Sequence, residues 1–168
     1  MKRLNRVMVI TSALLIAMFI TQATAYAQIG QDPQTKARHS RIVGLWDVQV
    51  TNTSCATGAT LAAFSALHKF DLGGTGQVVP ATNPMGLSAH MMIWNHVEND
   101  DYLMAVKMFR FDAGGTNIGW IVLNFEVSIT EDADEYSGSG ISQVFDSAGN
   151  LVGGSCPTLT GTRFTGEP

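Results

Sequence analysis

The stretch Ile42–Thr53, IVGLWDVQVTNT, alternates apolar and polar side chains with the period of two that a half-buried β-strand requires. The residues of its apolar face are Trp46, Val48 and Val50. This stretch shows no sustained helical period. It therefore predicts a strand with one face toward a core and one toward solvent.

Outward from this stretch, short runs rich in β-branched and aromatic residues alternate with clusters of Gly, Asp and Asn. We predict strands at 42–53, 61–71, 75–80, 88–97, 101–111, 117–129, 135–145 and 157–165, with an optional short piece at 150–153. Only residues 59–66 show a weak helical period, and the strand at 101–111 is apolar on both faces. Eight strands with short connections predict an all-β fold, an eight-stranded antiparallel up-and-down β-barrel.

The connections share a turn chemistry. Phe70-Asp71-Leu72-Gly73-Gly74-Thr75 recurs as Phe111-Asp112-Ala113-Gly114-Gly115-Thr116, and Phe145-Asp146-Ser147-Ala148-Gly149-Asn150 is a looser copy. Asp and Gly tolerate the backbone conformations of tight hairpin loops. We interpret the copies as repeated turns rather than propeller blades, since their spacing is uneven.

Residues 1–27 have the composition of a signal peptide. The positive residues Lys2, Arg3 and Arg6 precede an apolar stretch, 7–20, which is too short for the roughly 20 residues of a membrane span. Small residues then lead to a predicted cleavage after Ala27, with Ala25 as the second choice. We therefore expect a secreted or periplasmic protein with a flexible lead-in at 28–41, a barrel domain at 42–168 and no membrane span after cleavage.

Removing that segment changes the composition of the 168-residue chain, which has a formal charge of −4. The remaining 141 residues keep all 17 Gly and both Cys and hold seven basic and fourteen acidic residues. The formal charge becomes −7, which disfavours nucleic acid and anionic membrane as partners. A chain of this length buries enough surface for one core without a structural metal.

The first and last strands of a closed eight-stranded meander are antiparallel neighbours, so paired residues keep a nearly constant index sum. Cys55 with Cys156 gives 211 and Trp46 with Arg163 gives 209, so both pairs fit one closure register. Export favours a Cys55–Cys156 disulfide, since a catalytic or metal-binding thiol pair would need a CxxC spacing or a nearby His cluster.

Gly44-Leu45-Trp46 resembles the G-x-W motif at the start of the first strand in the lipocalin and wider calycin families. Arg163 is similar to the basic residue that packs across that Trp, and Asp134-Glu135-Tyr136 keeps only the Tyr of the family's T-D-Y. The resemblance implies that Gly44, Trp46 and Arg163 form a structural closure at one end. Cation–π stacking of Arg163 on Trp46 would plug one end of any barrel in the same way.

The two rims of such a barrel differ in composition. Connections after odd-numbered strands are mostly small, neutral and Gly-rich, and the resemblance implies that this rim is the mouth. The other rim collects the acidic residues Asp71, Glu98, Asp100, Asp101, Glu131, Asp132, Asp134 and Glu135. We interpret them as solvated turn residues, with a weak cation site at Asp132, Asp134 and Glu135 as the alternative.

The candidate ligand-binding residues are apolar and cluster in neighbouring strands. They are Phe64, Met92, Trp94, Met104, Met108 and Trp120. Flexible, polarisable thioethers suit an adaptable apolar pocket, although a Met patch also serves as ordinary core. His90 and His96 share a face but lie roughly 20 Å apart along a strand, too far to bind one metal, and His68 is interpreted as a packed or surface histidine.

The leading hypothesis is an exported lipocalin-like protein that binds a small, mainly apolar molecule, without a cofactor, a metal or catalytic residues. Tyr136-Ser137-Gly138-Ser139-Gly140 resembles the Gly-rich strand of allene-oxide-cyclase and dirigent barrels, which implies an enzyme that steers a reactive substrate. That alternative needs polar groups such as His90, Tyr102 or Tyr136 to converge in a cavity. A ligand-free envelope or interaction protein is the third hypothesis.

The export prediction is tested by expressing the full chain in a bacterium with a secretion pathway. We expect N-terminal sequencing of the exported protein to begin at Gln28, because cleavage follows Ala27 in the A-x-A site. An Ala27→Asp variant should shift or block cleavage. A mature protein that begins at Met1 would contradict the prediction.

Overall fold

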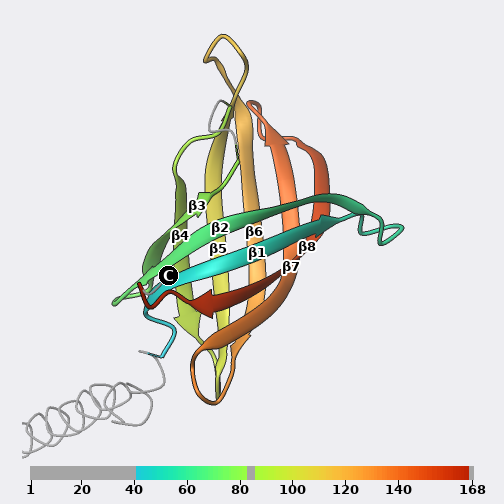
Figure 1. Ribbon diagram of the computed structural model, residues 1–168. Coiled ribbons are helices and arrows are strands. Elements are labelled where there is room, and N and C mark those ends of the chain that lie inside the picture. The colour runs from blue at the N-terminus through green and yellow to red at the C-terminus, as the bar shows by residue number, and fades with distance from the viewer. Residues whose placement is uncertain (1–40, 83–85, 167–168) are drawn as a thin grey trace, which may run out of the picture. The chain divides into compact units, whose positions relative to one another are not determined.

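The computed structural model describes residues 41–82 and 86–166, and in them the chain forms a closed barrel with the strand order β1 to β8 (Figure 1). The strands are β1 (Gly44–Thr53), β2 (Thr60–Asp71), β3 (Thr75–Pro80), β4 (His90–His96), β5 (Asp101–Phe111), β6 (Asn117–Ile129), β7 (Glu135–Asp146) and β8 (Leu151–Arg163). Every neighbouring pair is antiparallel. The predicted eight-stranded antiparallel barrel is confirmed, and it is consistent with a lipocalin- or calycin-like fold.

Some predicted features lie outside the described residues. They are the signal peptide at 1–27 with its cleavage site, the lead-in up to residue 40, and Met85. In the described part of the chain no helix is long and apolar enough to cross a membrane.

Several strand boundaries differ from the prediction, most by one or two residues. The last strand begins at Leu151 rather than 157 and absorbs the optional piece at 150–153, because Gly153 and Gly154 pair with Val144 and Gln143 of β7. The two glycines look like a loop in sequence, yet both pair with β7, and at Gly154 a Cβ would overlap the Ser142 carbonyl. The first and fourth strands begin at Gly44 and His90, two residues later than predicted, and residues 60–66 are strand rather than helix.

The barrel closes between β1 and β8. Trp46 pairs with Arg163 and Thr53 with Cys156, so the predicted index sum of 209 holds along the whole seam (Figure 1). The predicted disulfide joins Cys55 to Cys156 across 101 residues, with a Cα–Cα distance of 5.1 Å. Cys55 lies just beyond the last paired residue of β1, which explains its index sum of 211.

Arg163 organises the closed end of the barrel. Its guanidinium lies 4.2 Å from the centroid of the Trp46 ring, and its nitrogens donate hydrogen bonds to the carbonyl oxygens of Arg41, Val43 and Ala133. The Trp46 indole is fully buried and donates to the Ile42 carbonyl at 2.8 Å. The segment before β1 and the β6–β7 connection are thereby tied to one cation on β8.

The core is aromatic at this closed end. Trp46, Phe70, Trp94, Tyr102 and Tyr136 form a connected set of edge-to-face contacts with centroid distances of 4.9–6.0 Å. On β5 the inward positions left open by the sequence are the even ones, which carry a Tyr, two Met and a Val. Large rings in such contacts fill this half of the interior completely.

Two of the repeated turns use one device. The Asp112 carboxylate accepts hydrogen bonds from the backbone N–H groups of Gly114 and Thr116, and Asp146 does the same for Ala148 and Asn150. An Asp that caps its own loop favours a tight hairpin.

Packing at the closed end is tested by two glycines on β8. A Cβ added at Gly161 would overlap the ring of the buried Tyr136, whereas a Cβ at Gly153 would meet Val144 Cβ at 3.9 Å, an ordinary contact. We expect Gly161→Ala to lower the free energy of unfolding by about 1–3 kcal/mol. Gly153→Ala is the matched control and should leave it unchanged or slightly raised. Urea denaturation measures both, and equal effects would contradict the packing argument.

Candidate functional site

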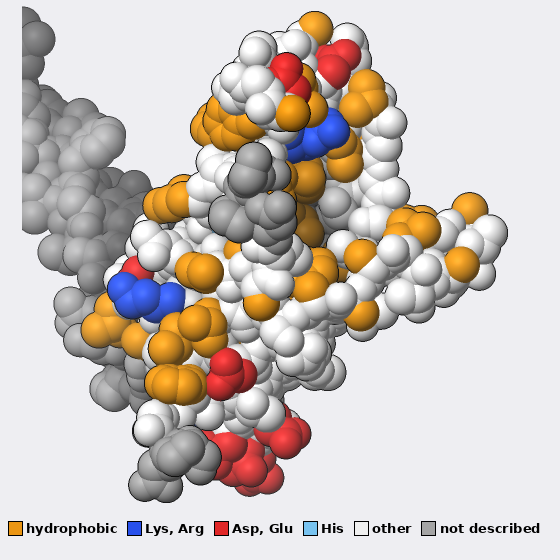
Figure 2. Space-filling model, turned by 45° about the horizontal axis from the view of Figure 1, so that its top comes forward, with side chains coloured by type: hydrophobic (Ala, Val, Ile, Leu, Met, Phe, Trp, Pro, Cys, Tyr) orange, Lys and Arg blue, Asp and Glu red, His pale blue; other side chains and the backbone are white. Residues whose placement is uncertain are grey.

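A cavity of about 510 Å³ occupies the half of the barrel away from Arg163. It lies toward the connections that follow β1 and β3, since its lining includes Asn52 at the end of β1 and Thr82, Gly86 and Leu87 between β3 and β4. This is the rim of odd-numbered connections. The β4–β5 and β6–β7 connections lie on the opposite rim. Figure 2 shows a group of acidic side chains toward the lower end of the view and further acidic side chains at its upper tip.

The cavity wall is mostly apolar and comes from seven strands. The apolar lining residues are Val50, Ala62, Phe64, Val78, Pro80, Leu87, Val106, Met108, Ile121, Leu123 and Phe125. The polar ones are Asn52, His68, Thr82, His90 and Ser142. None of these side chains is a Lys, Arg, Asp or Glu, so the wall carries no permanent charge.

Small residues explain why this half is hollow. Where the closed end has Trp, Tyr and Phe, the corresponding inward positions near the mouth include Ala62 on β2 and Ser142 on β7. Gly140, just before Ser142, allows β6 and β7 to approach so closely that a Cβ there would overlap the Asn124 carbonyl. Removing side-chain volume at the mouth leaves space that the aromatic end lacks.

His68 and His90 face each other across one strand. His68 pairs with Val78, and Val78 pairs with His90, so the two histidines occupy one row of the sheet with backbones about 10 Å apart. Both side chains point into the barrel, and they are only 2% and 7% exposed. His68 is thus a packed histidine, and its place beside His90 cannot be predicted from the sequence because it depends on the register of the intervening strand.

His68 is held by Tyr136. The phenol oxygen lies 2.7 Å from His68 Nδ1, and burial raises the pKa of the Tyr136 hydroxyl, which therefore stays protonated. Burial, with a smaller contribution from His90, lowers the pKa of His68 from 6.5 to about 4. The tautomer of the neutral imidazole sets whether the phenol donates to Nδ1 or accepts from it, and this hydrogen bond occupies one of the two ring nitrogens.

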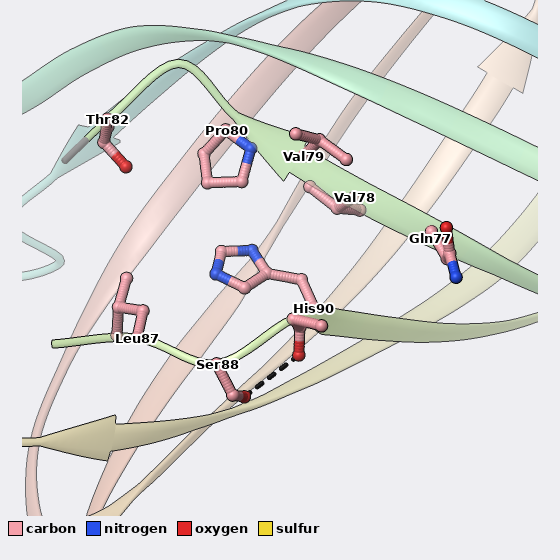
Figure 3. Close-up of a pocket in the computed structure, with 9 residues that line it drawn as sticks. Gln77, Val78, Val79, Pro80, Thr82, Leu87, Ser88 and His90 are labelled. Atoms are coloured by element: carbon pink, nitrogen blue, oxygen red, sulfur yellow. Dashed lines mark hydrogen bonds between the residues drawn. The ribbon is translucent and has the colours of Figure 1, made fainter. Parts of the chain in front are cut away.

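His90 has a different environment. Burial lowers its pKa as well, and no hydrogen bond joins its ring to another described residue. It lines both the main cavity and a side pocket of about 310 Å³ between β3 and β4. Figure 3 shows its ring between Pro80, at the end of β3, and Leu87, in the segment that precedes β4.

The side pocket arises because β3 and β4 pair over only four residues. Their last pair is Val78 with His90, and beyond it the two segments separate. Leu87 turns instead to β5, where it forms an isolated bridge to Arg110. The barrel wall is therefore thinnest beside His90.

One further polar atom at the cavity has no partner. The side-chain oxygen of Asn52 is buried and accepts no hydrogen bond from the described residues. A buried acceptor without a donor costs about 1–3 kcal/mol unless water or a ligand satisfies it. This marks the mouth as a second place where a polar group could be accommodated.

The predicted ligand-binding residues divide into three groups. Phe64 and Met108 line the cavity. Met92, Trp94 and Met104 point inward but belong to the filled core, and none of the three lines the cavity.

Trp120 lies on the outer face of the barrel. Its ring stacks on Phe145 at 5.5 Å, and the Lys107 ammonium lies 5.2 Å from its centroid. The odd positions of β6 face inward, so an even-numbered residue must face outward. That parity was readable from the alternation of Ile121, Leu123 and Phe125.

The acidic turn between β6 and β7 is organised by internal hydrogen bonds. Asp132 accepts from the Thr130 hydroxyl at 2.6 Å and from the backbone of Asp134, and the Thr130 hydrogen bond lowers the pKa of the Asp132 carboxyl. Over residues 41–82 and 86–166, no group of three or more His, Cys, Asp or Glu side chains is placed to hold a metal ion.

Comparisons with known proteins add little. No protein family matches the chain, and no curated protein resembles it closely enough in sequence to count as a relative. Among solved structures, the crystal structure of Rv2717c from M. tuberculosis aligns over 79% of this chain and 98% of its own, with 13% identity and a TM-score of 0.38. A likeness at this level carries no functional argument.

The buried histidines predict an acid-sensitive fold. Between about pH 6.5 and 4 the unfolded chain binds a proton at His68 that the folded chain does not, so stability falls as the pH falls. We expect a loss of about 3 kcal/mol from this group, measured by urea unfolding at about pH 7 and pH 4.

The matched variant is His68→Gln, which does not titrate and keeps a neutral acceptor for Tyr136. Its stability should vary less with pH than that of the wild type. The residual dependence would come mainly from His90, whose pKa is also lowered. An unchanged dependence in His68→Gln would contradict the assignment.

Proposed function

We propose that the protein is an exported, lipocalin-like binding protein that holds a small, mainly apolar molecule in its barrel. The observation that carries this proposal is the cavity of about 510 Å³ with its uncharged, largely aliphatic and aromatic wall. Ligand sites typically have volumes of about 300–1,000 Å³ and this kind of lining. Burial of an apolar molecule there would gain hydrophobic free energy without displacing core side chains.

The two ends of the barrel support this proposal differently. The aromatic end, tied by Arg163, forms a rigid floor, while the opposite end has small residues and leaves room. A preformed space on a rigid scaffold lowers the ordering cost of binding. The Cys55–Cys156 disulfide braces β8 near the mouth and supports an oxidising, extracellular or periplasmic compartment.

The alternative functions have less support. A steering enzyme needs polar groups such as His90, Tyr102 or Tyr136 to converge in the cavity, and of these three only His90 is a lining residue. A ligand-free interaction protein would be favoured by a packed core together with a contiguous apolar patch on the outer face. An outward row of Phe109, Trp120, Phe145 and Leu151 across β5 to β8 is compatible with a contact surface, and it does not account for the cavity.

Binding is tested with N-phenyl-1-naphthylamine, an uncharged apolar dye whose fluorescence rises in apolar surroundings. We expect saturable binding of one dye per chain. Ala62→Trp places a large side chain at the cavity wall and should weaken binding at least fivefold, because it occupies part of the space.

Ala63→Trp is the matched control, since Ala63 is the next residue of β2, is exposed and does not line the cavity. Its dye affinity should equal that of the wild type. Dye binding that is absent, or equally affected by both variants, would contradict the proposed function.

A further inference from the structure

The cavity contains two neutral imidazoles where an entirely apolar ligand would need none. His68 and His90 lie in one row of the barrel, both line the cavity, and both are more than nine-tenths buried. A buried polar group without a partner is unfavourable, so apolar contacts alone leave this part of the site unsatisfied. The hydrogen-bonding capacity of the two rings therefore bears on which polar group the ligand carries.

Their hydrogen-bonding capacities differ. The Tyr136 hydroxyl occupies His68 Nδ1, which leaves Nε2 as the second ring nitrogen, a donor or an acceptor according to the tautomer. The His90 ring makes no hydrogen bond to the described residues, and a neutral imidazole has one donor and one acceptor nitrogen. A hydroxyl group both donates and accepts, so it can bind either tautomer of each ring, and a carbonyl oxygen can accept from whichever ring presents its N–H group.

The charge of the site limits the ligand further. No lysine or arginine is among the lining residues. The titratable group that faces His90 is His68 on β2, and behind His68 lies Tyr136 on β7, which is hydrogen-bonded to His68 and does not line the cavity. Burial keeps both histidines neutral near pH 7. An ionised carboxylate would lose its hydration without gaining a cationic partner, which is strongly unfavourable.

We propose that the ligand is an uncharged amphiphile, with an apolar body in the aliphatic part of the cavity and one hydroxyl or carbonyl group between His68 and His90. This inference rests on the proposed function and narrows it. The site discriminates against the carboxylate of the same chain length. The discrimination comes from the two uncharged imidazoles, which offer no cationic partner, and not from the size of the cavity.

The test compares 1-decanol with decanoate at about pH 8, each displacing N-phenyl-1-naphthylamine from the mature protein. The two competitors share one alkyl chain and differ in charge. We expect 1-decanol to displace the dye at a concentration at least tenfold lower than decanoate requires. Equal displacement would overturn the inference and leave the proposed function intact, whereas failure of the dye to bind would remove the proposed function itself.

Three variants distinguish a hydrogen bond from His90 to the ligand from simple transfer of the alkyl chain into an apolar cavity. His90→Leu should weaken 1-decanol at least fivefold while dye affinity is kept, and His90→Gln, which stays neutral and hydrogen-bonds, should restore most of the loss. Met91→Leu, on the outward neighbour of His90, is the control and should change nothing. An unchanged affinity of His90→Leu for 1-decanol would overturn the inference. If His90→Leu fails to fold, the wild-type comparison and His90→Gln still decide it.

Discussion

The stacking of Arg163 on Trp46 is the interaction on which the rest of the structure depends. It lies at the seam where the first and last strands meet, and a barrel without that seam would be an open sheet with two exposed edges. The guanidinium also binds three backbone carbonyls, which fastens the segment before β1 and the β6–β7 connection to the same point. Arg163, on the last strand, thereby reinforces the closure of the barrel between β1 and β8.

Closure at one end has a consequence at the other. Aromatic side chains pack the closed end of the eight-stranded barrel, and smaller residues such as Ala62 and Ser142 leave a cavity toward the other end. Seven of the eight strands contribute to the wall of this cavity. The thin wall beside His90, where β3 and β4 pair over four residues, is its weakest place.

His68 and His90 are polar residues buried in a mostly apolar interior. Burying two imidazoles lowers their pKa and makes the fold sensitive to acid, and an aliphatic residue in either place would avoid that cost. Tyr136 offsets part of it by binding His68. The remaining hydrogen-bonding capacity points into the cavity, which is the physical basis for an uncharged polar group on the ligand.

The sequence by itself determined the barrel, because period-two alternation, Asp–Gly turns and the shared register of Trp46–Arg163 and Cys55–Cys156 are local patterns or simple index sums. Strand boundaries were harder where β8 begins, since Gly153 and Gly154 read as loop until a paired neighbour is known. Phe64 and Met108 were placed in the site by composition, while the outward position of Trp120 follows from strand parity. Only the tertiary structure decided that His68 and His90 line one cavity from the same row of the sheet, on either side of Val78, because their placement depends on the register of a third strand. Only the sizes of the inward side chains on seven strands decided which part of the barrel stays hollow.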